Sequence, residues 1–487
     1  MISNRQTVRY ATLLLLFLTF FFFWGGPTLT LAASPKHYQD LTFPPLPEIT
    51  LPKYERYQLA NGLTVYLLPD HDWPIVRGTA LIRVGSRWEP ADQAGLADLT
   101  GDLIRNGGTR NHPIEELDTL LADRAATIET GFGVTAGQVS FTALREHTPD
   151  VFTWFSEILQ APAFDLEQIA VAKQRRRGQI ARRNDQPESI AGREFYRLIY
   201  GPDSPYSRRP EYATLERIDR QALVEFAQTY IQPSQMILGI VGDFDPPAMR
   251  DLIQAQFGPW QPTPPALPPI PTIDQQPPIG TFFINQPQLS QSYIYTGHLG
   301  DTLRDPDVFA LYVMNGVLNG FGGRLFNRIR SQQGLAYSVY AAWNPEYDYP
   351  GVFFGMGQTK TAATLAFFNA LQQEFRRLQT EPIQANELAY AQDAILNSFI
   401  FNFRSPAQTL YRLMRYDYFG YDSDYIFQYQ QGVKATTITD VQRVAQAHLQ
   451  PEQLTTLIVG NQTALALELA QFPQPIQEIE ITIPNLN

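Results

Sequence analysis

The sequence predicts an α+β fold made of two homologous halves, each a mostly antiparallel sheet with helices packed on one face. A proline-rich linker is expected to join the halves into a clamp. Three observations support this expectation: an internal repeat, a proline-rich junction between the repeats, and paired strand-like segments that alternate with paired helix-like segments.

The internal repeat is the clearest of the three. Residues 226–243 read FAQTYIQPSQMILGIVGD, and residues 444–461 read VAQAHLQPEQLTTLIVGN. They align without gaps at an offset of 218, with eight identities in eighteen positions. Because the identities include three glutamines as well as Ile-Val-Gly, a shared helix-turn-strand pattern is not sufficient to explain them. The repeat therefore indicates a duplication.

The junction lies in residues 258–280, GPWQPTPPALPPIPTIDQQPPIG. Proline at this density prevents both a helix and a central strand, so an extended, semi-rigid linker is expected. We therefore predict an N-terminal domain over residues 50–257 and a C-terminal domain over residues 281–475.

Within the first half, hydrophobic periodicity predicts the individual elements. Strands are expected at 63–69 and 79–85, helices at 91–108 and 114–126, then a hairpin, then helices at 149–160 and about 165–185. Gly107-Gly108 supplies the stop for the first helix. The second half is expected to repeat this order.

Composition excludes several functional classes. With 44% hydrophobic and 13% aromatic residues the 487-residue chain can build substantial cores. A net charge of −11 argues against a nucleic-acid-binding surface. The absence of cysteine excludes disulfides, thiolate metal ligands, a cysteine nucleophile and a lipoprotein acylation site.

The N-terminus predicts export. Arg5 and Arg9 precede an apolar run at 11–24, and small residues follow at 32–34. This order is typical of a secretory signal, and the run is short for a bilayer span. Residues 1–33 are therefore interpreted as a signal peptide or, alternatively, an uncleaved N-terminal anchor. The folded part is expected in the periplasm or another extracytoplasmic compartment.

The first half also carries a family resemblance. Val-Gly-Ser-Arg-Trp-Glu at 84–89, Ala-Gly-Leu-Ala at 94–97 and Gly-Gly-Thr at 107–109 resemble the pitrilysin/insulinase peptidases. The resemblance covers roughly residues 50–475. It is greatest to mitochondrial processing peptidase, whose alpha-type subunit lacks zinc, and to bacterial two-subunit members. The family's catalytic helix carries H-x-x-E-H, two zinc-binding histidines and a glutamate that activates water.

The positions that this motif would occupy are degenerate. Aspartate stands at both histidine positions, Asp98 and Asp102, and glycine stands at the general-base position, Gly101. The third family ligand, a glutamate, falls at Gly178 beside three arginines that would repel a dication. The six histidines form no H-x-H, H-x₂-H or H-x₃-H pair. We therefore expect no metal in this chain and interpret the two aspartates as solvated. An unconventional metal site around them remains the alternative.

The second half retains the family's other motif, GFGGRLFNRIRSQQGLAYSVY at 320–340. The resemblance implies that Arg330 and Tyr337 assist catalysis and that the stretch Gly320, Phe321, Gly322 and Gly323 contacts substrate. Tyrosine can donate a hydrogen bond to an oxyanion, and arginine offers a fork of donors. The alternative is that Arg330 pairs with a local acid and Tyr337 packs in the core.

The combined pattern leads to a functional hypothesis. We expect a non-catalytic subunit that binds peptides or unfolded segments and supplies Arg330 and Tyr337 in trans to a zinc-bearing homologous subunit. No cofactor is expected in this chain, and the zinc is expected in the partner of the heterodimer. The main alternative is an inert peptide-binding or structural subunit; the lesser one is an active metallopeptidase with an unconventional metal site.

Overall fold

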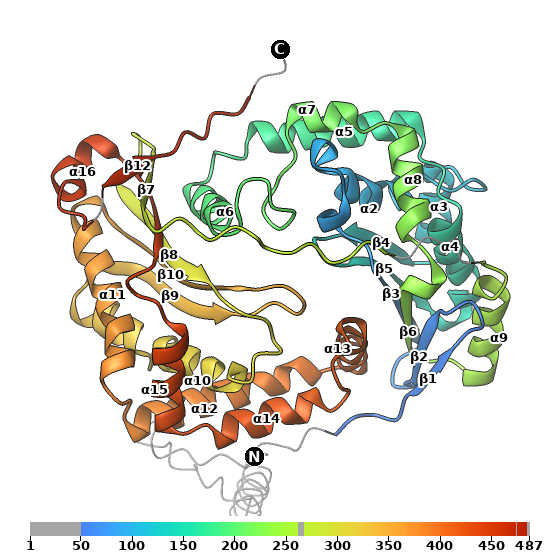
Figure 1. The fold of residues 1–487 in the computed structure, drawn as a ribbon. Helices are drawn as coiled ribbons and strands as arrows, with labels where there is room; N and C mark the ends of the chain where they lie inside the picture. Colours follow the sequence, from blue (N-terminus) through green and yellow to red (C-terminus); the bar gives the residue numbers. More distant parts are fainter. Residues whose placement is uncertain (1–49, 262–266, 474, 485–487) are drawn as a thin grey trace, which may run out of the picture. The chain divides into compact units, whose positions relative to one another are not determined.

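The computed structural model describes residues 50–261, 267–473 and 475–484. They contain two six-stranded sheets (Figure 1). The first sheet has the order β1-β2-β6-β3-β5-β4 and the second the order β12-β7-β11-β8-β10-β9. Most neighbouring strands are antiparallel, but β2 and β6 are parallel, as are β7 and its two neighbours. The fold is therefore α+β with two mixed sheets.

The first half contains these strands and helices: β1 Glu55–Gln58, β2 Thr64–Pro69, β3 Ile75–Ile82, α2 Leu96–Asn106, α3 Ile114–Asp123, β4 Thr127–Phe132, β5 Gly137–Leu144, α4 Thr148–Gln160, α5 Leu166–Ala181, α6 Pro187–Tyr200, α7 Tyr212–Arg217, α8 Arg220–Tyr230, β6 Met236–Gly242 and α9 Pro246–Phe257. Two expectations need correction. The second strand lies at 75–82 and not at 79–85. The helix expected from residue 91 begins at Leu96, because Gly95 adopts φ +102°, a left-handed conformation that interrupts it.

The second half contains β7 Gly280–Asn285, β8 Gln291–Leu299, α10 Val308–Leu318, the π-helical segment η6 Leu325–Gln332, β9 Ala336–Asn344, β10 Val352–Lys360, α11 Thr364–Thr380, α12 Ala385–Phe399, the short 3₁₀ segment η8 Ile400–Phe403, α13 Pro406–Phe419, α14 Tyr425–Ala435, α15 Ile438–His448, β11 Thr455–Gly460, α16 Gln462–Leu469 and β12 Ile476–Glu478. Helix α15 lies 218 positions after α8, the offset of the sequence repeat, and strand β11 ends 218 positions after β6. The described linker residues between α9 and β7 form no helix or strand.

Each half has its own core on one face of its sheet. In the first half, α2, α4, α8 and α9 cover that face, and their apolar side chains contact inward residues of the strands such as Val65 and Phe141. In the second half, α10, α11 and α15 play the same part, with Ile294 and Ile458 among the sheet residues. Alternate strand residues point to opposite faces, so each sheet has a second face that must also be covered.

The second face of each sheet is covered by a helix from the other half, which the sequence expectation of helices on one face did not include. Helix α6 packs on β8 and β11, where Phe195 and Ile199 join a cluster with Leu457. Helix α13 packs on β2, β3 and β6, where Met414 contacts the sheet at Gly239. A Cβ at Gly239 would lie 2.2 Å from the Met414 sulfur, so the glycine permits this close approach.

Polar contacts also join the two halves. The hydroxyl of Tyr418 on α13 lies 2.7 Å from the carbonyl oxygen of Thr135 and 3.1 Å from that of Ile82. The buried guanidinium of Arg87 forms an ion pair with Asp348 at 2.8 Å. These polar contacts add to the apolar packing that places α6 and α13 on the sheets of the opposite halves.

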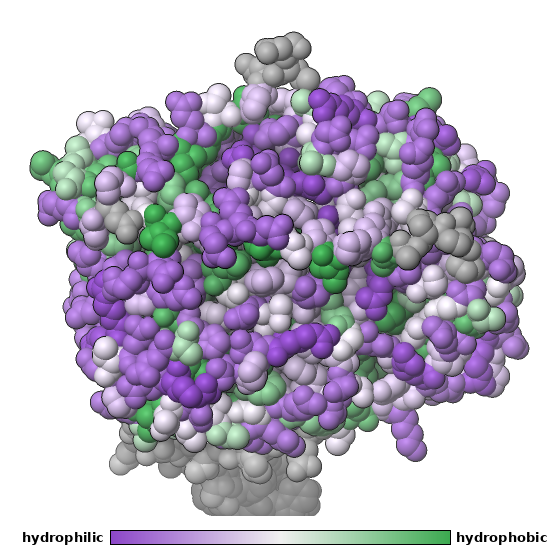
Figure 2. Space-filling model, viewed as in Figure 1, coloured by the Kyte–Doolittle hydropathy of each residue, from purple (hydrophilic) through white to green (hydrophobic). Residues whose placement is uncertain are grey.

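The surface is mainly polar on the face drawn in Figure 2, where hydrophobic residues form small groups among hydrophilic ones. One such group lies at the upper left, over α16 and β12. Among the helices of the described residues, none combines the length and the apolar character that crossing a membrane requires. The expected signal or anchor at 1–33 lies outside the described residues.

Candidate functional site

The degenerate metal positions lie on α2 and α5, which pack against each other. Helix α2 is positioned at its N-terminus by Glu89, whose two carboxylate oxygens accept the backbone N–H groups of Gly95 and Ala97 at 3.0 and 2.9 Å. Burial raises the pKa of Glu89, and these two N–H donors oppose the rise. Sequence reasoning did not single out this residue, although an acid just before a helix is a recognised stabilising signal.

The two aspartates of α2 are ion-paired, which corrects the expectation that they are solvated. Asp98 receives a two-pronged hydrogen bond from Arg176, with Nε–Oδ2 at 2.5 Å and Nη2–Oδ1 at 2.9 Å. Asp102 lies 3.4 Å from Arg175 and 3.8 Å from Arg176, and it accepts a hydrogen bond from Asn106. Burial raises the pKa of Asp98, while Arg176 lowers it. The positive charge that faces the two aspartates therefore comes from the guanidinium groups of Arg175 and Arg176.

The two glycines differ in the space around them. A Cβ at Gly101 would lie 2.6 Å from the backbone nitrogen of Phe132 on β4, so this strand leaves no room for a side chain. A Cβ at Gly178 would meet only the guanidinium of Arg182, at 3.5 Å, which is ordinary contact. The position of the catalytic glutamate is thus closed by the backbone, whereas the position of the third ligand is open.

These residues do not fit a catalytic zinc ion. A zinc site of this family needs three ligands, two histidine imidazoles and one carboxylate. It also needs a glutamate that activates water. The chain offers two carboxylates that already contact arginines, and a glycine packed on β4.

Arg330 and Tyr337 lie together in the second half. Arg330 is on η6, and its guanidinium carbon lies 5.2 Å from the ring centre of Tyr337, at the start of β9, and 4.9 Å from that of Phe326. Tyr337 is 75% exposed. Within the described residues Arg330 forms no ion pair. The arrangement differs from the alternative in which Arg330 pairs with an acid and Tyr337 is buried.

The glycine-rich stretch forms the turn before η6. Gly320 has φ +80°, a conformation that favours glycine. The Gly322 nitrogen donates to the hydroxyl of Tyr390 at 3.0 Å, and a Cβ at Gly323 would lie 2.1 Å from the carbonyl oxygen of Asn319. Phe321 is 79% exposed and lies edge-on to Phe326, with ring centres 5.0 Å apart. The turn thus presents an aromatic side chain next to the ring that contacts Arg330.

Two other arginines of the same motif anchor it. Arg324 is buried and forms a two-pronged ion pair with Glu387 at 2.7 and 2.8 Å. Arg328 contacts Glu374 at 2.9 Å. Because these two arginines are paired internally, they hold η6 while Arg330 remains available. The sequence did not show that, of these three arginines within seven residues, two form internal ion pairs and the third does not.

The edge of the second sheet is partly closed. Asn315 on α10 and Asn319, which caps its C-terminus, each form two hydrogen bonds to the β9 backbone, through Trp343 and Ala341 respectively. Side-chain amides thereby occupy backbone groups that an added strand would need. Strand β4 is the corresponding edge of the first sheet, and its Ile128 carbonyl accepts from Arg105.

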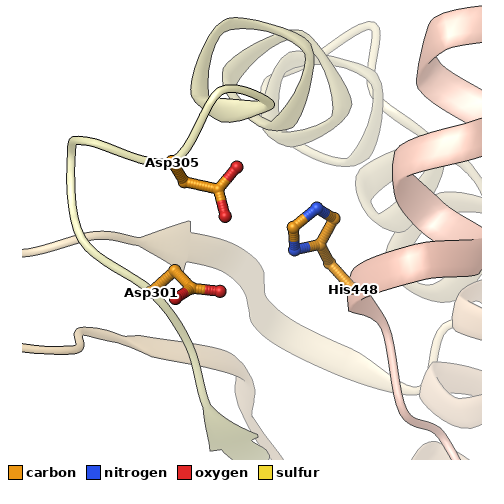
Figure 3. A group of neighbouring side chains, drawn as sticks. All are labelled: Asp301, Asp305 and His448. Atoms are coloured by element: carbon orange, nitrogen blue, oxygen red, sulfur yellow. The ribbon is translucent and has the colours of Figure 1, made fainter.

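A separate group of possible cation ligands lies away from these residues. Asp301, Asp305 and His448 place one ligand atom each within 4.8 Å of one another, and their side chains converge (Figure 3). Burial raises the pKa of Asp301, and Asp305 adds to the rise. His448 Nε2 lies 2.9 Å from Asp307, which is also paired with Arg443. Histidine spacing did not reveal this group, because its ligands come from distant segments.

The structure therefore presents two separate groups of the residues singled out in the sequence. One joins Asp98 and Asp102 with Arg175 and Arg176. The other joins Arg330 with Tyr337 and, through Phe326, with Phe321. Across the described part of the chain, no hydrogen bond, ion pair or ring contact connects the first group with the second.

Comparison with known proteins identifies relatives along most of the chain. Residues 70–200 match the family "Insulinase (Peptidase family M16)", and residues 217–395 match "Peptidase M16 inactive domain". An uncharacterized zinc protease of Bacillus subtilis, YmxG, is 22% identical over 74% of this chain and 86% of its own. A Helicobacter pylori protein named as the non-peptidase homolog YmxG is 21% identical over 78% of this chain and 87% of its own.

Solved structures share the fold. A peptidase M16 inactive domain from Pseudomonas fluorescens superposes with a TM-score of 0.76 at 20% identity, covering 84% of this chain and 98% of that one. The periplasmic protease PqqL of Escherichia coli gives 0.72 at 16% identity, covering 86% of this chain and 47% of that one. With both family domains matched, this chain belongs to the M16 insulinase/pitrilysin family of peptidases and peptidase homologues.

Proposed function

We propose that this chain is a non-catalytic subunit that binds peptide and assists a zinc-bearing homologue of the same family. The observation that carries the proposal is the contact between half-buried Arg330 and exposed Tyr337. Tyr337 is accessible to a second molecule, while the metal positions of the same chain hold an ion-pair cluster. The chain thus keeps side chains that can assist peptide hydrolysis, while the side chains that would activate water are replaced.

The chemistry of the pair suits assistance only. The Tyr337 hydroxyl can donate a hydrogen bond to the oxygen that becomes negative when a peptide carbonyl is attacked. The Arg330 guanidinium can donate to substrate carbonyls or a carboxylate. Neither group can generate hydroxide from water at neutral pH, so hydrolysis depends on the homologue.

The peptide is proposed to bind as an added strand. On β9, Ala341 and Trp343 are taken by the α10 asparagines, which disfavours this part of the second sheet. The β4 edge of the first sheet is the better candidate, because in the described structure its backbone has a side-chain hydrogen bond only at Ile128. Export is part of the same proposal. It is supported by the charged, apolar and small-residue order at the N-terminus and by the similarity to a structure named as the periplasmic protease PqqL.

The test is hydrolysis by the reconstituted pair. A tagged copy of the full chain is used to co-purify its partner, and peptide cleavage is measured for the chain alone, for the complex, and for complexes with Tyr337→Phe or Tyr340→Phe. Tyr340 is the matched control, since it is a second exposed tyrosine on β9. The chain alone should cleave nothing. Tyr337→Phe should lower kcat about 10²-fold or more, as loss of one oxyanion donor does, and Tyr340→Phe should not.

An inert peptide-binding or structural subunit is the second candidate, favoured by the relative named a non-peptidase homolog. If this second candidate function is correct, the complex should keep full peptidase activity when Arg330 and Tyr337 are both replaced. An active peptidase with a metal held by Asp98 and Asp102 is the least supported, because both carboxylates face arginines. Stoichiometric metal in the isolated chain would favour it.

A further inference from the structure

A pocket of about 350 Å³ lies between η8, α13 and the loop that follows β9. Its walls include the aromatic rings of Tyr347, Phe401 and Tyr411. Two arginines, Arg412 and Arg415, also line it. The pocket therefore combines apolar walls with two positive charges, on segments that carry neither Arg330 nor the α2 aspartates.

Neutral side chains and aromatic rings surround the two guanidinium groups within the described residues. In the part of the chain that the structure describes, neither Arg412 nor Arg415 forms an ion pair. Arg412 donates instead to the Asn402 side-chain oxygen at 2.6 Å. The guanidinium of Arg415 has a side-chain hydrogen bond with Tyr411, but its buried Nε has no hydrogen-bond partner among the described residues. A buried, unpartnered N–H of a charged group is costly unless something occupies the pocket to accept it.

Aromatic rings lie close to both arginines. The guanidinium carbon of Arg415 lies 4.7 Å from the ring centre of Tyr347 and 5.5 Å from that of Phe419. Arg412 lies 5.9 Å from the ring centre of Phe403. When a guanidinium stacks on a ring, its in-plane N–H donors stay available to a ligand.

Among the described residues, Glu346 is an acid whose charge acts on Arg415. Burial raises the pKa of Glu346, and the charge of Arg415 opposes that rise. Glu346 nevertheless forms no ion pair with either pocket arginine in the described structure. Elsewhere in the same half, buried arginines are matched by carboxylates, as Arg324 is by Glu387. The acceptor for the pocket arginines is therefore expected from outside the described chain.

We infer that this pocket binds a carboxylate of a peptide ligand, either an acidic side chain or the C-terminal carboxylate. A planar carboxylate accepts the parallel donors of a guanidinium. The aromatic walls suit the apolar stem of a glutamate or the last side chain of a peptide better than a doubly charged phosphate. The inference rests on the peptide-binding role proposed above and specifies the class of peptide that the chain selects.

The test measures binding to the full chain alone, at physiological salt and without a partner, so it does not depend on assisted hydrolysis. Fluorescently labelled peptides of one length differ only in one residue, glutamate, glutamine or phosphoserine, and are made with a C-terminal amide. A further glutamine peptide keeps a free C-terminal carboxylate. The glutamate peptide or the free-carboxylate peptide should bind about tenfold or more tightly than the amidated glutamine peptide. The peptide with the higher affinity shows whether the carboxylate comes from a side chain or from the C-terminus.

Variants locate the effect. Arg415→Met and Arg412→Gln should each remove the preference for carboxylate while peptide binding falls to the level of the amidated glutamine peptide. Arg404→Met is the matched control: it removes an exposed positive charge that stacks on Phe401 but does not line the pocket. It should keep the preference. Circular dichroism confirms folding, and Arg412→Gln serves if Arg415→Met does not fold.

Three results would overturn the inference: equal binding of the carboxylate and amide peptides, stronger binding of phosphoserine than of glutamate, or an equal loss in Arg404→Met. Failure of the reconstituted complex to need Tyr337 would refute the assisting role and leave this binding result unaffected. Carboxylate-independent binding together with Tyr337-dependent hydrolysis would refute only the pocket.

Discussion

Arg176 on α5 holds the carboxylate of Asp98 on α2 by two hydrogen bonds of 2.5 and 2.9 Å, at the position that the family resemblance aligns with a zinc-binding histidine. A guanidinium thus joins the two helices that carry the positions aligned with the zinc ligands. Because these positions hold an ion-pair cluster, building a metal site here would require more than exchanging two side chains.

The first prediction concerns zinc. The double variant Asp98→His, Asp102→His should bind no stoichiometric zinc, because Arg175 and Arg176 keep two positive charges at the site and Gly178 supplies no third ligand. Metal content of the purified variant, measured by mass spectrometry after dialysis against zinc, should stay near that of the wild type. About one zinc per chain would show that the arginines move aside.

The second prediction concerns the two glycines. Gly101→Ala should lower the free energy of unfolding by about 1–3 kcal/mol, because the new Cβ would lie 2.6 Å from the Phe132 backbone. Gly178→Ala, the matched control in α5, should leave it unchanged or raise it by up to about 1 kcal/mol, as alanine does in an open helical position. Urea unfolding measures both. Equal effects would contradict the difference in packing.

The third prediction concerns the closed edge of the second sheet. Asn319→Ala should destabilise the protein by about 1–3 kcal/mol, since the N–H and C=O of Ala341 lose their partners. It should also promote self-association, because an open edge can pair with another chain. Asn327→Ala is the control, as its side-chain amide makes no hydrogen bond in the described structure. Urea unfolding and light scattering give the two readouts; no difference between the variants would exclude the capping role.

The fourth prediction concerns pH. Glu194 is buried on α6 and contacts Arg193, Arg197 and Arg209. Burial raises its pKa, but the arginines outweigh burial and the net pKa is lowered. A lowered folded-state pKa adds stability above the ordinary glutamate value, about 4.3, and this stability is lost as pH falls through the folded-state value.

Glu194→Gln should therefore cost about 2–4 kcal/mol at pH 7, with the cost shrinking below about pH 4. Glu188→Gln, an exposed acid on the same helix, should cost little at either pH. Urea unfolding at pH 7, 5 and 3.5 follows the trend. A cost independent of pH would mean that Glu194 acts through packing and not through its charge.

The sequence was sufficient for much of the fold. The repeat at 226–243 and 444–461 identified the matching helices α8 and α15 and the central strands β6 and β11, because glutamine and glycine identities survive where apolar residues vary. It could not show that α6 and α13 are exchanged between the halves. Both helices are amphipathic, and their periodicity indicates a buried face without saying which sheet covers it.

The sequence predicted which residues belong to the candidate site but not how these residues contact one another. The arginines near Gly178 were read as repelling a metal, whereas Arg175 and Arg176 contact the aspartates directly. This pairing needs the contact between α2 and α5, which no local pattern encodes. The closure of Gly101 by β4 was also out of reach, because a glycine in a sequence does not show what lies beside its Cβ.

The exchanged helices bear on how such a chain could have arisen. In the described residues, one face of each sheet is covered mainly by a helix of the other half, α6 on the second sheet and α13 on the first. A protein made of a single repeat would therefore expose an apolar sheet face, which a second copy could cover by lending its helix. If two such copies were joined in one chain, the two halves would be free to diverge.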